Sequence, residues 1–336
     1  MDHFYMCLKK SNLTIILLLL LFTRGFSQEG LPVYFDYLSD NYYLVFPSMA
    51  GTGEDARIRL TARQQWFNVE SAPNLQTLSA HMRIQDSPSG VGAIVFNDAN
   101  GYHSQTGVKL TYSHHLMFFR DFIDLNQLSF GLSAGFVQSR LDESEFISIV
   151  PDPIITGADN SVYYFNVDAG VSYNYLDFYA HLAVKNIIGS GRDLYSAQEF
   201  DNLRRYLLTA GYAFGKTDWY YEPSFLLQFT EFTEEKTADF NIKVYREMEF
   251  GTLWGGLSYR RSFDGNDVQE LQLFTPILGI NYKNIVFAYT YSYQTGDLRI
   301  DNGGFHQLTL GYNFWKKDSW RRSRRNFQRT LLGRGD

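Results

Sequence analysis

The residues of this chain that come nearest to a catalytic set are a histidine and a serine close to acidic and amide side chains. His103 and Ser104 are adjacent, and Asp98 and Asn100 lie a few positions earlier. A serine nucleophile needs a histidine base and a third group that orients the imidazole. Residues 97–101, however, read Asn-Asp-Ala-Asn-Gly, which is a composition typical of a tight turn. We therefore interpret this cluster as a turn and expect no catalytic residue.

Other kinds of chemistry have equally little support in the sequence. No spacing of His, Asp or Glu predicts a metal site, and there is no phosphate-binding loop. The single cysteine, Cys7, lies in a predicted export signal, so we expect the mature chain to have neither a reactive thiol nor a disulfide. The sequence thus predicts a protein that is not an enzyme and that holds no metal or cofactor.

The first 27 residues are typical of a secretory signal peptide. Lys9 and Lys10 precede an apolar run at 13–22, and small residues stand just before Gln28. The run is too short for a stable membrane helix, so we expect residues 1–27 to be removed on export.

The rest of the chain is rich in alternating segments. In residues 285–294 and 307–314, bulky apolar side chains alternate with small or polar ones, and side chains alternate between the two faces of a strand. Aromatic residues make up 17% of the chain, and no later segment has the roughly 18 consecutive apolar residues of a spanning helix. These features favour an all-β fold, a transmembrane antiparallel β-barrel in the bacterial outer membrane. A secreted soluble β-sandwich is the alternative.

Fourteen strands are predicted in a single barrel domain that spans residues 56–315. A segment at 28–55, periplasmic or lumenal, precedes the barrel, and a basic periplasmic tail at 316–336 follows it. The predicted strands are at residues 56–67, 75–85, 90–98, 104–119, 126–141, 161–174, 176–187, 203–214, 218–231, 237–247, 249–262, 268–280, 284–295 and 304–315.

The lengths of the connections predict how the barrel is oriented. The longest ones, 142–160 and 186–202, are odd-numbered, whereas most even-numbered ones are short. Outer-membrane barrels have long extracellular loops and short periplasmic turns. We therefore expect the long connections outside the cell and the C-terminus in the periplasm.

Fourteen strands enclose more space than the eight whose side chains can fill a barrel. Either the segment 28–55 and lumen-facing charges occupy this space, or the barrel conducts.

Three arginines, Arg57, Arg59 and Arg63, fall on the polar face of the first strand. They predict a charge ladder in the lumen, with acids such as Asp168 and Glu222 as partners. Contact with a segment threaded into the barrel is the alternative.

The connection 142–160 carries five acidic residues and no basic one. It is either a solvated face or a site for a partner or a divalent cation. Exposed apolar residues in such a loop can mark a partner surface, although packing into the barrel mouth would also explain them. The candidate anchors are Phe146, Ile147, Ile149, Ile154 and Ile155.

The tail 316–336 carries eight basic and two acidic residues. Arg321, Arg322, Arg324 and Arg325 could pair bidentately with carboxylates or phosphates of a partner. Simple attraction to anionic lipid is the alternative. Nucleic acid is not an expected ligand in the periplasm.

Short motifs follow one another in a fixed order along nearly all of the predicted mature chain. They are Arg63-Gln64-Gln65-Trp66, Ala72-Pro73, Gln76, Leu78, Ser79, His81, Gly90-Val91-Gly92, Asn97-Asp98, Gly101, residues 128–135, residues 165–170, Tyr206, residues 211–214 and residues 310–314. Together they resemble the signature of the PorP/SprF family of Bacteroidota outer-membrane proteins. Two features depart from it: residue Phe46 stands where the family has Asn before Pro47, and the basic tail extends past the last strand.

The resemblance implies a role in the type IX secretion system and in gliding motility. It implies a non-enzymatic barrel that binds and anchors a large surface adhesin through the adhesin's type IX C-terminal domain, or assists its secretion. Periplasmic components of the machinery and outer-membrane lipid are the other implied partners. The alternative function is a passive outer-membrane diffusion channel.

Overall fold

Most of the predicted barrel is described by the computed structural model. The described residues are 38, 41–53, 55–65, 72–85, 87–118, 126–143, 159–189, 204–216, 218–263, 272–295 and 304–314. The predicted domain boundaries at residues 27 and 315 lie outside these residues, as do the apolar loop residues 146–155 and the tail 316–336.

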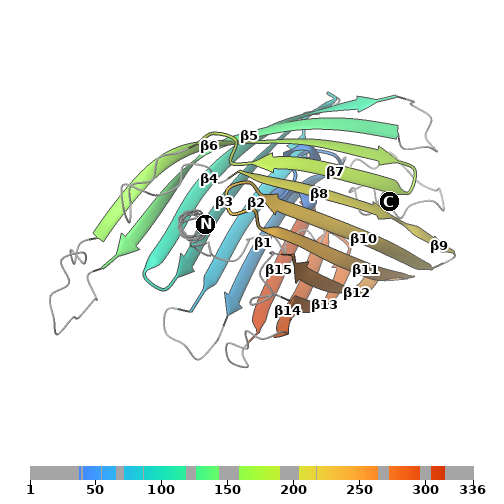
Figure 1. Cartoon of the computed structure of the whole chain (residues 1–336). Helices are drawn as coiled ribbons and strands as arrows, with labels where there is room; N and C mark the ends of the chain where they lie inside the picture. The colour runs from blue at the N-terminus through green and yellow to red at the C-terminus, as the bar shows by residue number, and fades with distance from the viewer. Residues whose placement is uncertain are drawn as a thin grey trace, which may run out of the picture. The chain divides into compact units, whose positions relative to one another are not determined.

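The strands form one antiparallel sheet that closes on itself (Figure 1). They are β1 (Ala56–Gln65), β2 (Asn74–Arg83), β3 (Ser89–Asn100), β4 (His103–Met117), β5 (Asn126–Asp142), β6 (Asp159–Tyr175), β7 (Phe178–Lys185), β8 (Arg205–Tyr212), β9 (Phe214–Lys216), β10 (Trp219–Thr230), β11 (Lys236–Met248), β12 (Gly251–Ser262), β13 (Gln272–Tyr282), β14 (Ile285–Thr295) and β15 (Phe305–Phe314). The first and last strands pair from Ala56↔Phe314 to Gln65↔Phe305, which completes the ring.

β8 and β9 are two halves of one barrel strand. Both pair with β10 in the same register, through Ser224↔Gly211 and Tyr221↔Phe214. The break between them lies opposite Pro223, which has no backbone N–H to donate to the ladder. The barrel therefore has fourteen strands, as the sequence predicts, and the strand ends agree with the predicted ones to within a few residues.

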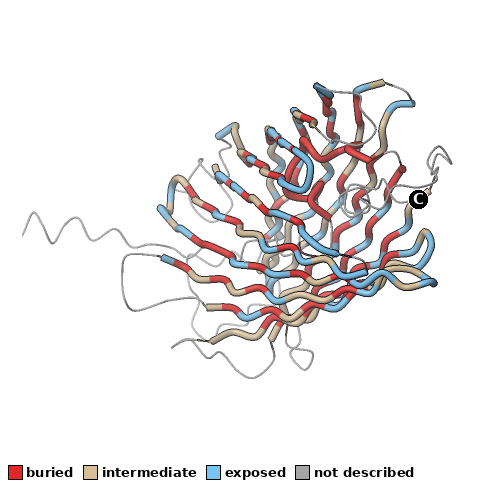
Figure 2. The backbone as a smooth tube through the Cα atoms, turned by 90° about the vertical axis from the view of Figure 1, so that its right-hand side faces the viewer, coloured by how far each residue is buried: buried red, intermediate tan, exposed pale blue. Residues whose placement is uncertain are grey.

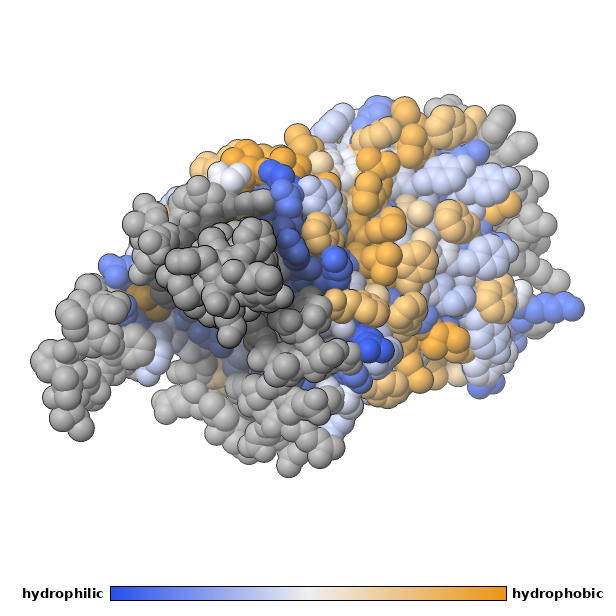
Figure 3. All heavy atoms as spheres, viewed as in Figure 1, coloured by the Kyte–Doolittle hydropathy of each residue, from blue (hydrophilic) through white to orange (hydrophobic). Residues whose placement is uncertain are grey.

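Burial alternates along the strands as the alternation in sequence predicts. In β14, Ile285, Phe287 and Tyr289 are exposed, whereas Val286 and Ala288 are buried. Figure 2 shows the same alternation of buried and exposed residues around the barrel wall. Figure 3 shows apolar side chains, in orange, over the strands of the outer surface. An apolar outer wall with paired backbone groups is what a hydrocarbon environment requires.

The two longest connections in the sheet are those after β5 and after β7, as predicted. Two other connections depart from the expected rule of long odd and short even loops. The third is only Gly101 and Tyr102, where Gly101 has a positive φ of 61° that permits a tight turn. The fourth, at residues 118–125, is longer. No helix in the described part of the chain is long and apolar enough to cross a bilayer.

The barrel interior contains an apolar cluster as well as polar side chains. Residues from the segment before β1, among them Val45 and Phe46, are fully buried. They belong to one cluster with wall residues such as Leu207, Leu226 and Leu273. The inner face is thus only partly polar, and its apolar part shares one buried cluster with the chain's own N-terminal segment.

We expect Leu278→Arg to destabilise the barrel because Leu278 lies midway along β13 and is 66% exposed on the outer wall. An arginine on a lipid-facing position near the bilayer midplane costs about 2–4 kcal/mol. Denaturant titration of the protein folded into lipid vesicles measures this cost. Leu278→Phe is the matched control and should stay close to wild type. Equal stability of the arginine variant would contradict a lipid-facing β13.

Candidate functional site: the lumenal segment and its polar contacts

Residues 41–53, here called the lumenal segment, run through the barrel interior, and every one of them is buried. Two short 3-10 turns shape the segment, η2 (Tyr42–Leu44) and η3 (Pro47–Met49). Pro47 begins η3, where its missing N–H costs nothing. Gly51 ends this stretch at a φ of +64° and leads the chain toward β1.

Consecutive residues of the lumenal segment bind opposite walls of the barrel. Asn41 donates a hydrogen bond from Nδ2 to Ser79 of β2, at 3.1 Å. The Tyr42 hydroxyl donates to Glu222 of β10, at 3.2 Å. β2 and β10 are seven strands apart in either direction around the fourteen-stranded ring. The segment therefore bridges the barrel from wall to wall.

Glu222 is fully buried and accepts hydrogen bonds from three tyrosines. Tyr179 donates to Oε1 at 2.6 Å, Tyr42 donates to the same oxygen, and Tyr245 donates to Oε2 at 2.9 Å. Burial, and then the neighbouring Tyr179 and Glu222, raise the pKa of Tyr42 well above its usual value, so its hydroxyl keeps its proton. A buried carboxylate is tolerated only when hydrogen bonds replace its hydration. Tyr42 thus ties the lumenal segment to this carboxylate.

The Ala50 carbonyl is held by two side chains of β4. Ser113 Oγ donates to it at 2.5 Å, and His115 Nε2 lies 3.0 Å away. A carbonyl only accepts, so we assign the proton of His115 to Nε2, which leaves Nδ1 to accept from Ser129 at 2.9 Å. These contacts fix the end of η3 against the β4–β5 wall.

Gly51 binds β2 through both of its backbone polar groups. Its N–H donates to His81 Nδ1 at 3.0 Å, and its carbonyl accepts from Arg83 Nε at 3.2 Å. Because His81 Nδ1 accepts this bond, its ring proton is assigned to Nε2. The chain is therefore fixed at the point where it leaves the lumenal segment for β1.

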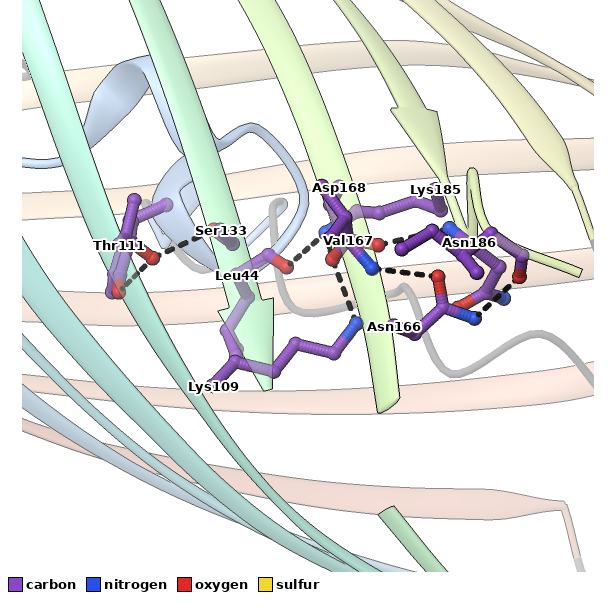
Figure 4. A network of polar contacts seen from close by, with 11 residues as sticks. Leu44, Lys109, Thr111, Ser133, Asn166, Val167, Asp168, Lys185 and Asn186 are labelled. Carbon is purple, nitrogen blue, oxygen red and sulfur yellow. Dashed lines mark hydrogen bonds and ion pairs between the residues drawn. The ribbon is translucent and has the colours of Figure 1, made fainter. Parts of the chain in front are cut away.

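A charged network connects the lumenal segment to the start of the long connection after β7 (Figure 4). Asp168 Oδ2 lies 2.7 Å from Lys109 Nζ and 3.4 Å from Lys185 Nζ. Asp168 Oδ1 accepts from the backbone N–H of Asn186, at 2.9 Å. Lys185 also donates to the Leu44 carbonyl, at 3.2 Å. One carboxylate thus joins three strands, the segment and a rim connection.

The predicted lumenal arginines are buried on the inner face of β1, but they do not pair with the acids proposed for them. Arg57 lies 3.5 Å from Asp55, and the Arg63 guanidinium lies 4.2 Å from the Phe305 ring centre. Arg59 donates to the Ile58 carbonyl. Pairing with Asp168 and Glu222 was wrong because those acids stand on β6 and β10, several strands away, where other side chains already bind them.

The remaining sequence candidates are separated from this site. His103 Nε2 lies 2.9 Å from Ser139 of β5, a contact at one end of the β4–β5 pair. Among the described residues, no group of three or more His, Cys, Asp or Glu side chains could hold a metal ion. The anchors proposed in 146–155 and the tail arginines lie outside the described residues.

The tyrosines around Glu222 were missed by the sequence analysis. Their signal was present: Tyr179 and Tyr245 are large aromatic residues on the inner faces of β7 and β11, where the alternation predicts polar side chains. Bulky residues on an inner face indicate that something packs against them. Tyr179 contacts Tyr42 of the lumenal segment, with the two hydroxyls 2.9 Å apart, and Tyr245 shares Glu222 with Tyr42.

Comparison with known protein families shows which family the chain belongs to. Residues 26–312 match the model of the family described as type IX secretion system membrane protein PorP/SprF. The chain belongs to this family. PorP/SprF is a family of secretion membrane proteins rather than of enzymes, and membership implies association with the secretion machinery and its substrates. With its β-barrel fold, this PorP/SprF protein is an outer-membrane protein.

Solved structures that resemble this PorP/SprF protein are distant. The TodX monoaromatic hydrocarbon channel is 11% identical, with a TM-score of 0.46 over 81% of this chain and 92% of TodX. The CymD monoaromatic hydrocarbon channel is 9% identical, with a TM-score of 0.46 over 82% of this chain and 91% of CymD. The Acinetobacter baumannii protein Omp33 is 9% identical, with a TM-score of 0.41 over 79% of this chain and 100% of Omp33. The chain matches no curated protein.

We expect Tyr42→Phe to lower the free energy of unfolding. The substitution removes one of the two hydrogen bonds to Glu222 Oε1, which keeps the bond from Tyr179, and a hydrogen bond of this kind contributes about 0.5–1.5 kcal/mol. Denaturant unfolding in detergent or vesicles measures the change. Tyr163→Phe removes a hydroxyl from a tyrosine that is 69% exposed and should leave stability unchanged. Equal effects of the two substitutions would contradict a specific role for Tyr42.

We expect Gly131→Leu to displace the lumenal segment. A Cβ at Gly131 would overlap the Pro47 carbonyl carbon and the Ser48 amide, which are backbone atoms that cannot swing aside. Maleimide labelling of Ser48→Cys reports the displacement, and should be slow in the parent and faster in the leucine variant.

Gly101→Asn is the matched control, because a Cβ there has no atom within 4 Å and asparagine tolerates the positive φ. Unchanged labelling in the leucine variant would show that the segment does not press on β5.

Proposed function

We propose that this protein is a non-enzymatic outer-membrane barrel that binds and anchors a large secreted adhesin through its type IX C-terminal domain, or assists its secretion. Outer-membrane lipid surrounds the wall, and periplasmic components of the secretion and gliding machinery are further partners. The family supports the general role. The specific role rests on how the interior of the barrel is built.

The observation that carries the proposal is the bridge made by the lumenal segment. Asn41 and Tyr42 bind walls on opposite sides of the ring, and Ala50 and Gly51 are held by four further side chains. A barrel braced in this way is a rigid support that can present its rim to a partner. Binding surfaces are commonly irregular loops held by such a rigid scaffold.

The same bridge disfavours the alternative, a passive diffusion channel. A channel of this kind needs a continuous aqueous path through the barrel. Here the lumenal segment is buried and joins an apolar cluster that includes Leu207, Leu226 and Leu273 of the wall. Opening a path past it would expose this cluster to water and break the hydrogen bonds of Tyr42.

In the proposed orientation the connections after β5 and β7 face the outside, and the chain ends in the periplasm. The adhesin then contacts 142–160 and 186–202, with the apolar residues Phe146, Ile147, Ile149, Ile154 and Ile155 as anchors. The tail arginines Arg321, Arg322, Arg324 and Arg325 contact the periplasmic side. Asp168 supports the extracellular surface in this orientation, because its carboxylate accepts a hydrogen bond from the backbone N–H of Asn186, where the connection after β7 begins.

Affinity purification from native outer membranes in mild detergent tests the proposal. We expect a large exported multidomain protein to be recovered with the wild-type barrel. Deleting residues 144–156 should abolish both its recovery and its surface display because the proposed anchors are removed. Deleting 264–270, another connection on the same side, is the matched control and should preserve both.

Conductance of the purified barrel in planar bilayers tests the alternative function, a diffusion channel. The proposal expects no stable open pore in the wild-type protein. A steady open conductance together with failure to recover any exported protein would establish the channel instead.

A further inference from the structure

β6 is much longer than the strand that follows it. It has 17 residues and pairs with β5 along its whole length, up to Asp142↔Asp159. β7 has 8 residues, and its last pair with β6 is Ala169↔Val184. Beyond this pair, Asn166, Val167 and Asp168 are hydrogen-bonded to the start of the next connection, at residues 186–188. In the described part of the chain, residues 159–163 of β6, here called the β6 edge, therefore have a neighbouring strand on one side only.

The direction of the backbone groups on the β6 edge follows from Val167. Its carbonyl accepts from Ile187 N–H at 2.9 Å, so it points away from β5. Along an antiparallel strand, the N–H and C=O of one residue point to the same side, and successive residues alternate. Ser161 and Tyr163 therefore direct their N–H and C=O groups away from β5. Two donors and two acceptors, about 7 Å apart along the strand, face outward from the sheet.

The β6 edge stands beyond the membrane-spanning part of the strand. A transmembrane strand needs about 9–11 residues, and counting from the other end of β6, at Tyr175, reaches Phe165. On this count the edge extends past the bilayer core, at the end of the barrel that carries the connection after β5. Tyr163 is 69% exposed there, and the ring centres of Phe136 and Phe165 lie 5.2 Å apart just below it.

Within the described part of the chain, the β6 edge has little of the usual protection against strand pairing. Natural edge strands carry lysine, proline or a bulge, or are covered by a loop. Residues 159–163 read Asp-Asn-Ser-Val-Tyr, with one charge and neither lysine nor proline. The register with β5 continues through them without a bulge. A regular edge of this kind, with Val162 and Tyr163, is a template for an added strand.

We propose that the β6 edge binds an extended segment of the secreted partner by strand addition, with an apolar side chain of that segment packed on Tyr163. The inference rests on the proposed function, which supplies a polypeptide partner at this end of the barrel. The chemistry favours this occupant, because alternating amide and carbonyl groups at strand spacing are matched by an extended backbone. Backbone pairing gives affinity, and the side chain next to Tyr163 gives selectivity.

Tyr163→Pro tests the backbone contact without disturbing the barrel. It removes the N–H that faces outward, whereas the N–H groups of Val162 and Tyr164, which face β5, remain. Proline is accepted on an edge strand with its nitrogen toward solvent. Tyr163→Thr is the matched control, because it keeps the N–H and removes only the ring. Heat-modifiable gel mobility confirms that each variant is a folded barrel.

The experiment compares recovery of the exported protein from native membranes by wild type and both variants. It also follows amide exchange of Ser161 and Tyr163 in the wild-type barrel alone and in the recovered complex. We expect recovery with Tyr163→Pro to fall about tenfold, and recovery with Tyr163→Thr to fall far less. Exchange at both amides should be fast in the barrel alone and slow in the complex.

Several outcomes would overturn the inference. Wild-type recovery by Tyr163→Pro, or equal losses with proline and threonine, would exclude backbone pairing while leaving the proposed function intact. Slow exchange in the barrel alone at any dilution would show that the chain's own connection covers the edge. Slow exchange that disappears on dilution would show pairing with a second copy. If wild type recovers no exported protein, the proposed function itself fails.

Discussion

The width of the ring is the constraint on which the rest of this structure depends. Fourteen strands enclose more space than the inward side chains of the wall can fill, and the ring encloses an apolar cluster to which both the wall and the segment before β1 contribute. The chain meets this constraint with its own residues 41–53. Their backbone is irregular, and irregular backbone is tolerated at membrane depth only where protein surrounds it. Segment and wall therefore stabilise each other.

The contacts between them divide into two kinds with different consequences. Apolar burial of Val45 and Phe46 supplies free energy without fixing a direction. The hydrogen bonds to Glu222, His81 and His115 fix position, because each requires a donor and an acceptor at defined places. A buried carboxylate or imidazole left without its partner loses more free energy than the hydrogen bond contributes when it is formed. The polar contacts thus specify one arrangement of the segment, and the apolar ones hold it there.

Much of the fold could be predicted from the sequence, because alternation at period two directly reports which face of a strand meets an apolar environment. The strand count, the long connections after β5 and β7 and the buried β1 arginines followed from it. The pairing partners did not. Asp168 and Glu222 were assigned to the arginines by charge alone, whereas strand order separates them from β1 and brings lysines or tyrosines beside them. Sequence gives the face on which a residue lies, but only the closed ring gives its neighbours.

The position of the lumenal segment in the chain bears on how the barrel assembles. It directly precedes β1, which pairs with β15 at the seam of the sheet, and it binds strands from β2 to β10. Joining the two ends of so long a sheet is a nonlocal step that carries a large loop-closure entropy. A segment that already binds both β2 and β10 shortens the effective distance between the two ends of the sheet, β1 and β15. The same residues that lie inside the closed barrel can therefore act as an internal template for closing the seam.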